Sequence, residues 1–192
     1  FACVGCHPHS ASALDEAGAA TLRSLASSPK AVAIGEIGLD FYRNLSPPDA
    51  QRAVFQEMLE LAGELGLPVV IHARQADEDT FAILSRWAGQ VRRPEGRALG
   101  VLRCFSGDLT LALRYHELGF LISLAGTVTY PNAGRQAAVA AGLPLDAIVV
   151  RSGSEVYGRA KGALSRPDER SPLAPTCEFG RELAEVERIA RD

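Results

Sequence analysis

The sequence lacks any apolar run approaching the roughly 20 residues that a helix needs to cross a bilayer, so we predict no membrane-spanning segment. It contains only four cysteines among its 192 residues, which is not the content of a disulfide scaffold, and a reducing cytoplasm is the expected location. Neither sign of charge is in large excess, because 20 Lys and Arg stand against 23 Asp and Glu and leave a net charge of −3. The sequence therefore has no basic footprint for non-specific DNA binding, and a nucleic-acid substrate would have to be held locally at a cleft, for example through a metal ion.

The composition is that of an ordinary globular protein. Hydrophobic residues make up 47% of the chain and charged residues 22%, so most of it is expected to fold. The amino end begins at Phe1 without a methionine, and it lacks the charged region and long apolar stretch of a signal peptide. We therefore expect the chain to be a piece of something longer.

Short apolar runs alternate with longer amphipathic stretches over residues 1–150. The runs are rich in Val, Ile and Leu and do not alternate cleanly with polar residues, which is typical of parallel strands buried on both faces. Because strand and helix patterns follow one another in turn, we predict parallel strands with right-handed crossovers. Six strands are predicted, over residues 1–5, 31–35, 68–72, 100–104, 120–124 and 147–150.

The clearest helix is predicted over residues 47–65. Ser46 suits the N-cap, Pro47 suits the first helical position and Gly66 suits the end of the helix. One face carries apolar residues at helical spacing, namely Val54, Met58, Leu61, Ala62 and Leu65. Weaker patterns predict helices over residues 11–27, 77–87, 109–118 and 133–141.

This alternation predicts an α/β fold, either a doubly wound sheet or a TIM (β/α)8-type barrel. With six recognisable strands, a barrel would be incomplete. From residue 151 the chain becomes rich in Gly, Pro and charge, which indicates a loop-rich segment. We predict a barrel portion over residues 1–150 and a divergent segment over residues 151–192 that can end in a short helix with Phe179, Leu183, Val186 and Ala190 on one face.

Two polar residues stand where predicted strands end, which is where functional side chains of parallel α/β proteins gather. Glu36 follows the run 31–35, and His72 ends the run 68–72. A carboxylate that emerges from a buried strand needs a partner, and a Glu and a His at one barrel mouth would make two ligands of a metal site. The alternative is that Glu36 pairs with a nearby arginine and that His72 is a satisfied core histidine.

The cysteines near the amino end allow two further interpretations. Cys3, Cys6 and His7 match the haem-attachment pattern C-x-x-C-H, and a zinc site that adds His9 is conceivable. The match falls in a predicted strand, however, where alternation would direct the two cysteines to opposite faces. We therefore predict that Cys3 and Cys6 are small buried hydrophobic residues.

Six segments resemble, in order, the motifs of the TatD family of metal-dependent hydrolases. They are GCHPH at 5–9, AIGEIGLDFYR at 33–43, QRAVF at 51–55, LPVVIHAR at 67–74, CFSG at 104–107 and SLAGTVTYP at 123–131. The resemblance implies a TIM-type barrel of the amidohydrolase kind that holds one or two divalent ions and removes nucleotides from a DNA end. Mg²⁺ is the expected ion, with Mn²⁺ or Zn²⁺ as alternatives.

The resemblance also assigns roles to individual residues. Metal ions in such a site generate a hydroxide nucleophile and neutralise charge on the reacting phosphate. By position, Glu36 matches a metal-bridging glutamate and His72 a metal-binding histidine. The residues expected to contact the substrate are His7, His9, Arg74, Arg103 and Ser106.

The sequence departs from the family at three places. The family usually opens with an H-x-H strand that supplies two metal ligands, and this chain starts after that point. Arg103 stands where the family has a histidine, and it can pair with Glu36 in place of a metal or bind phosphate. Gly153 stands at the place of an aspartate that acts as ligand or general base, so no catalytic residue is assigned, although Glu155 is a candidate substitute.

Two functions therefore compete. The first is a TatD-like metal-dependent DNase, an exonuclease with an impaired metal site in this chain. The second is a catalytically inactive scaffold that binds phosphate or a partner. A six-stranded arc would also expose two sheet edges, so we expect self-association unless a longer parent protein covers them.

Overall fold

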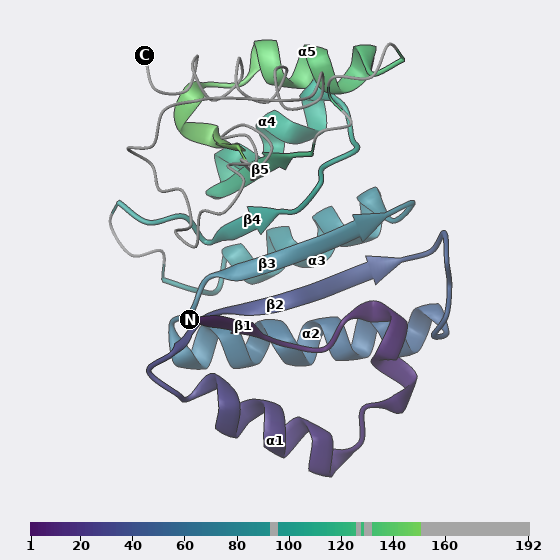
Figure 1. Cartoon of the computed structure of the whole chain (residues 1–192), viewed down its shortest axis with the longest axis vertical. Helices are drawn as coiled ribbons and strands as arrows, with labels where there is room; N and C mark the ends of the chain where they lie inside the picture. The colour runs from purple at the N-terminus through teal and green to yellow at the C-terminus, as the bar shows by residue number, and fades with distance from the viewer. Residues whose placement is uncertain (93–95, 126–127, 129–131, 151–192) are drawn as a thin grey trace, which may run out of the picture.

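Six parallel strands form one sheet in the computed structural model, which describes residues 1–92, 96–125, 128 and 132–150. The strands lie in order of sequence from β1 to β6 (Figure 1). A doubly wound sheet reverses its strand order part-way, so the uninterrupted order favours the barrel alternative. All six predicted strands are found: β1 (Ala2–Val4), β2 (Ala31–Asp40), β3 (Val69–Arg74), β4 (Gly100–Leu102), β5 (Phe120–Leu124) and β6 (Ile148–Val150).

The helices pack against the strands beside them in sequence. Figure 1 shows α2 and α3 running behind β2 and β3. Among the described residues, no helix combines the length and hydropathy that a bilayer crossing demands. The helical elements are η1 (Pro8–Ala13), α1 (Glu16–Ala26), α2 (Pro48–Leu65), α3 (Asp77–Ala88), α4 (Leu109–Leu118), α5 (Gly134–Gly142) and η3 (Leu145–Ala147).

The two faces of the sheet differ in burial. Val70 of β3 and Val101 of β4 lie opposite one another and are half-buried, which contradicts the prediction of strands buried on both faces. Side chains alternate along a strand, so His72 and Arg103, two residues further on, belong to this same half-buried face. The opposite face forms the core, with Ile34, Ile71, Leu102 and Ile122 fully buried.

β2 continues five residues further than predicted, so Glu36 lies within the strand and not after it. The pairing with β3 skips Glu36, because the register shifts between Gly35 and Ile37. Such a bulge redirects a side chain, here toward the neighbouring strand. Gly38 has φ 137°, and a Cβ at this position would lie 2.0 Å from the carbonyl oxygen of His72. Only glycine therefore lets β2 continue beside β3.

The helix starts also differ from prediction. α2 begins at Pro48 with Pro47 as the N-cap, and Ser46 does not cap it. The Ser46 hydroxyl instead donates to the carbonyl oxygen of His9 at 3.0 Å, a partner far away in sequence. The predicted helix over residues 11–27 is divided into η1 and α1, and Asp15 caps α1. The other described helices lie within one residue of their predicted bounds, and the predicted helix around residues 179–190 lies outside the described residues.

A cavity of about 1020 Å³ opens at the amino ends of the strands. Its lining is mainly apolar and includes Val32, Val69, Trp87 and Leu99. Polar residues expected at a functional site lie at the opposite, carboxyl ends. This cavity therefore lies at the end of the sheet opposite to the candidate chemistry.

Candidate metal centre

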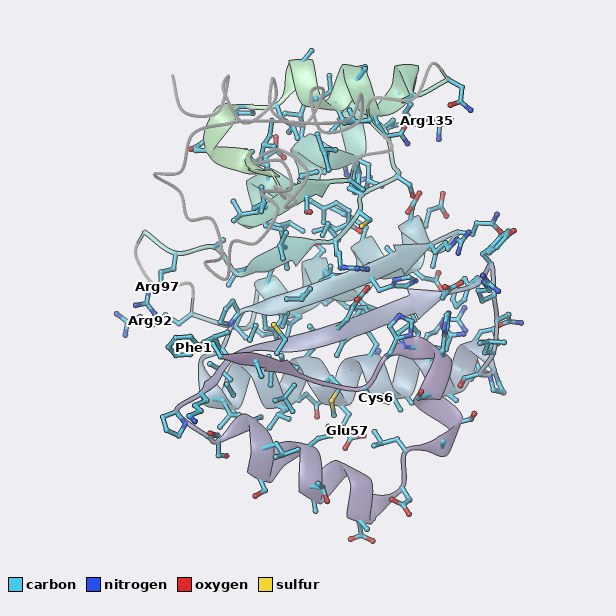
Figure 2. All side chains as sticks on the ribbon, in the orientation of Figure 1. Phe1, Cys6, Glu57, Arg92, Arg97 and Arg135 are labelled. Carbon is cyan, nitrogen blue, oxygen red and sulfur yellow. The ribbon has the colours of Figure 1, made fainter. Side chains whose placement is uncertain are left out.

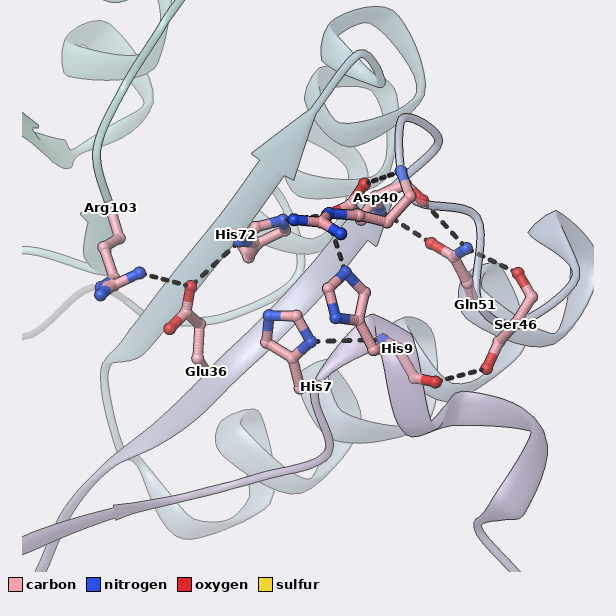
Figure 3. Close-up of polar contacts among 9 residues, drawn as sticks. His7, His9, Glu36, Asp40, Ser46, Gln51, His72 and Arg103 are labelled. Atoms are coloured by element: carbon pink, nitrogen blue, oxygen red, sulfur yellow. Dashed lines mark hydrogen bonds and ion pairs between the residues drawn. The ribbon is translucent and has the colours of Figure 1, made fainter.

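His7, Glu36 and His72 form a compact group beside the carboxyl ends of β1, β2 and β3 (Figure 3). One potential ligand atom from each residue lies within 4.8 Å of the others. The rings of His7 and His72 have centroids 4.8 Å apart. All three residues are partly exposed, so the group is accessible to a solute. Because they come from separate elements, the group exists only when β2, β3 and the segment that joins β1 to η1 are aligned.

The Oε1 atom of Glu36 accepts two hydrogen bonds. Nδ1 of His72 and Nη1 of Arg103 each lie 3.1 Å from it. The hydrogen bond from His72 is the largest influence on the pKa of Glu36 and lowers it, burial raises it, and the charge of Arg103 lowers it further. The net effect is a lowered pKa, so Glu36 is an anion at neutral pH. The predicted pairing of Arg103 with Glu36 is present.

Asp40 is a buried carboxylate that joins two histidines. Its Oδ2 lies 2.8 Å from Nε2 of His9 and 3.0 Å from Nε2 of His72, and its Oδ1 accepts the backbone N–H of Arg43 at 2.7 Å. Burial raises the pKa of Asp40, but the hydrogen bonds from Arg43, His9 and His72 outweigh burial and lower it to about 2. No role was predicted for Asp40, although it belongs to the same family-like run, residues 33–43, as Glu36.

His72 has a carboxylate at each ring nitrogen. Burial lowers its pKa, while the hydrogen bonds to Glu36 and Asp40 raise it, and the net shift is upward. When both ring nitrogens carry protons, Nε2 donates to Asp40 and Nδ1 donates to Glu36; loss of the Nδ1 proton leaves a lone pair that faces Glu36. A carboxylate behind a histidine ligand is the common arrangement at metal sites. A divalent cation would take the place of the proton between His72 and Glu36.

His7 is held differently, because it is the N-cap of η1. Its Nδ1 accepts the backbone N–H of His9 at 3.2 Å. Burial and then the nearby His72 and His9 lower its pKa, so the ring is neutral at neutral pH. The proton then lies on Nε2, and this tautomer suits donation to a substrate oxygen. Ligation through Nε2 would move the proton to Nδ1 and break the contact with His9.

A buried glutamine fixes Asp40 in turn. Gln51 Oε1 accepts the backbone N–H of Asp40 at 2.8 Å, and its amide donates to the carbonyl oxygens of Asp40 at 3.2 Å and of Ser46 at 2.7 Å. No role was predicted for Gln51 from the sequence. A signal was present, because Gln51 stands three residues before Val54 in the apolar stripe of α2, and a buried polar side chain there needs partners.

Two predicted substrate contacts are not brought into the group. The guanidinium of Arg74 lies over the ring of Tyr42, 3.9 Å from its centroid. Ser106 is exposed in the segment after β4, and no polar contact joins it to the group within the described residues. Gly153 and Glu155, the positions of the expected aspartate and its candidate substitute, lie outside the described residues.

The cysteines do not join the group. Cys6 is buried, as predicted, and burial followed by the charge of Glu57 on α2 raises the pKa of its thiol (Figure 2). A thiol in this state is a poor metal ligand. Cys3 is exposed, contrary to prediction, because β1 lies at the edge of the sheet. The haem and zinc interpretations therefore gain no support from the described residues.

The sequence of the chain matches a known protein family. The family described as TatD related DNase matches residues 1–154. The chain belongs to the TatD family. Among curated relatives, this TatD chain is 34% identical over 152 residues to the uncharacterized metal-dependent hydrolase YabD of Bacillus subtilis, which is 79% of this chain and 57% of the relative. It is 41% identical over 133 residues to the 3′-5′ ssDNA/RNA exonuclease TatD of Erwinia tasmaniensis, which is 69% of this chain and 49% of the relative.

Solved structures agree on the fold. The TatD homolog YjjV from Escherichia coli K12 superposes with a TM-score of 0.72 at 27% identity, covering 99% of this chain and 73% of that one. A TatD family hydrolase from Entamoeba histolytica gives a TM-score of 0.65 at 24% identity, covering 77% and 48%. The predicted TIM-type barrel fold is confirmed, and the described strands form an open arc of it. The chain spans about half the length of the curated relatives it matches.

The residues of the group fit a divalent cation. Glu36 and His72 present an oxygen and a nitrogen to one point, and Asp40 supports the histidine from behind. His7 can supply a third donor once its tautomer changes. Two imidazoles and one carboxylate form a ligand set that suits Zn²⁺ or Mn²⁺, whereas Mg²⁺ prefers oxygen ligands.

Proposed function

We propose that this TatD chain is a metal-dependent phosphodiesterase that removes nucleotides from the ends of DNA. The observation that carries the proposal is the group of His7, Glu36 and His72, whose ligand atoms lie within 4.8 Å of one another. The names of the relatives, a metal-dependent hydrolase and a 3′-5′ ssDNA/RNA exonuclease, support the same chemistry. Single-stranded RNA is therefore included among the substrates to be tested.

Each side chain of the group has a part in this proposal. Glu36 and His72 hold the cation, and Asp40 orients His72. The cation, when bound, activates a water molecule and neutralises charge on the phosphate. His7 supplies the third ligand through Nε2, and His9, held by Asp40, lies beside it with ring centroids 4.3 Å apart, where it can contact a phosphate oxygen.

The identity of the cation is part of the proposal. The resemblance to the family suggested Mg²⁺, but the two imidazoles favour Mn²⁺ or Zn²⁺. We propose Mn²⁺ or Zn²⁺ as the tighter-binding ions and Mg²⁺ as a weaker one. The order of activation by the three ions tests this point directly.

A specific observation favours a second candidate function. Arg103 already supplies a positive charge to Glu36, and the expected aspartate is replaced by Gly153. With these two residues at the site, the chain can serve as a non-catalytic scaffold in which Arg103 and the histidines bind phosphate. Planar guanidinium groups match phosphate oxygens well.

For cell location we propose the cytoplasm. Cys3, Cys6 and Cys104 are free thiols. Unpaired cysteines are the usual state in a reducing compartment, which supports this proposal.

The test is release of nucleotides from 5′-labelled single-stranded DNA and RNA, with Mg²⁺, Mn²⁺ or Zn²⁺ added to chelator-treated protein. The variant is Glu36→Gln, which keeps the size of the side chain but removes its charge. The matched control is Glu117→Gln, because Glu117 is exposed on α4 and remote from the group. Circular dichroism establishes that each variant is folded.

We expect metal-dependent shortening from the 3′ end that Glu36→Gln reduces by at least about a hundred-fold, and that Glu117→Gln leaves unchanged. Folded protein that is no more active than Glu36→Gln with every ion would refute the enzyme proposal. Binding of an unhydrolysed oligonucleotide or of inorganic phosphate in that case would support the scaffold.

A further inference from the structure

One carboxylate oxygen of Glu36 is shared by two nitrogen groups. Oε1 of Glu36 contacts His72 Nδ1, and Nη1 of Arg103 lies on the same atom at the same distance of 3.1 Å. A divalent cation held by Glu36 and His72 would need the carboxylate that Arg103 already contacts. Arg103 therefore competes with the cation for Glu36.

The backbone that carries Arg103 is fixed. Its N–H donates to the carbonyl oxygen of Ile71 at 2.8 Å, so the residue is joined to β3 one position before His72. Cys104, which follows, has φ 49° and turns the chain away directly after the strand. The side chain thus starts from a defined point on the half-buried face and extends to Glu36 (Figure 3).

The charge of Arg103 is permanent. A guanidinium does not lose its proton at any working pH, so the pair with Glu36 persists wherever Glu36 is ionised. The Arg103 side chain is 44% exposed and that of Glu36 is 23% exposed. The pair is therefore accessible enough to open, and a bound cation can displace Arg103 without unfolding the strand.

We propose that Arg103 is a resident counter-ion of Glu36 that lowers the affinity of the His7–Glu36–His72 group for divalent cations. It does so by occupying Oε1 and by placing a positive charge beside the bound ion. The inference uses the ligands of the proposed function, but it concerns cation affinity and not turnover. The repulsion between Arg103 and a bound cation a few ångströms away, in a partly solvated site screened by salt, corresponds to a change of about ten-fold in the affinity for the cation.

The experiment is titration of the full chain with Mn²⁺, with free Mn²⁺ measured by electron paramagnetic resonance. Arg103→Gln removes the charge, and Arg103→Lys keeps it. Arg114→Gln removes an equal charge from α4, where Arg114 lies over Phe81 and away from Glu36. Arg103→Gln is also made in the Glu36→Gln background to test whether the effect acts through Glu36.

We expect Arg103→Gln to bind Mn²⁺ about ten-fold more tightly than the unaltered chain. Arg103→Lys is expected to stay within about three-fold of the unaltered chain, because the charge remains. Arg114→Gln should have no effect, and Arg103→Gln should have no effect once Glu36 is Gln.

Unchanged or weaker Mn²⁺ binding by Arg103→Gln would overturn the inference, whether the unaltered chain binds tightly or neither protein binds. Tight binding by both leaves the proposed function intact, whereas no binding by either counts against that function as well. Binding by Arg103→Gln alone supports the inference while removing the metal-dependent function from the unaltered chain.

Discussion

Asp40 allows the sharpest test of how the centre is held together. Its buried carboxylate accepts hydrogen bonds from the backbone of Arg43 and from the rings of His9 and His72. Asp40→Asn keeps the shape of the side chain and removes its charge. The two histidines then lose the anion between them, and the N–H of Arg43 keeps at most a neutral acceptor.

The size of the effect follows from the pKa of Asp40. A fall from the ordinary 3.8 to about 2 corresponds to about 2.5 kcal/mol of stability at neutral pH. For a chain of this size, such a loss lowers the melting temperature by about 5–10 °C. A carboxylate with a lowered pKa stabilises the fold above its ordinary pKa, and this contribution is lost as the pH falls through about 2.

The assay is urea unfolding followed by circular dichroism, in the presence of a chelator and at a series of pH values. We expect the free energy of unfolding of Asp40→Asn to lie about 2.5 kcal/mol below that of the unaltered chain at neutral pH, and the two to converge as the pH falls from 3.8 to about 2. The control is Asp146→Asn, an exposed carboxylate, with a change within about 0.5 kcal/mol. Equal stability at neutral pH, or a difference that persists unchanged at the acid end, would refute the account of Asp40.

Two further outcomes are expected. Gly38→Ala should lower the free energy of unfolding by on the order of 4 kcal/mol or prevent folding, because its Cβ would meet the carbonyl oxygen of His72. Gly66→Ala should lower it by only about 1–2 kcal/mol, because nothing lies within 4 Å of a Cβ there. The melting temperatures of the two variants separate the effect of a positive φ, which both positions have, from the effect of the steric clash at Gly38. We also predict self-association through the sheet edges, which static light scattering tests, and a monodisperse monomer across the concentration range would contradict this prediction.

The elements were predictable where their signal is local. The apolar runs of the strands and the stripe of α2 follow directly from side-chain periodicity. The proximity of Glu36 and His72 was also predicted, from the carboxyl ends of neighbouring parallel strands, although Glu36 lies within the longer β2 and reaches His72 from the bulge.

The support of the centre could not be predicted in the same way. Asp40 reaches His72 only because β2 continues past its bulge, and this depends on the contact of Gly38 with β3. Ser46 was expected to cap α2 because it stands directly before Pro47, the expected first helical residue, but a partner outside the local sequence, the carbonyl oxygen of His9, holds its hydroxyl. These interactions join segments distant in sequence, so no local pattern reports them.

The shortness of β1 has a consequence for how the centre moves. Only three residues pair with β2 on this side, and two of them are exposed, whereas β2 and β3 are joined over most of their length. Local opening is least costly where few contacts are buried. Local opening at this edge is therefore confined to β1, because Asp40 and Ser46 hold η1 through the ring and the carbonyl oxygen of His9. A loosened β1 leaves His7 and His9 beside Glu36 and His72, so the centre keeps its geometry.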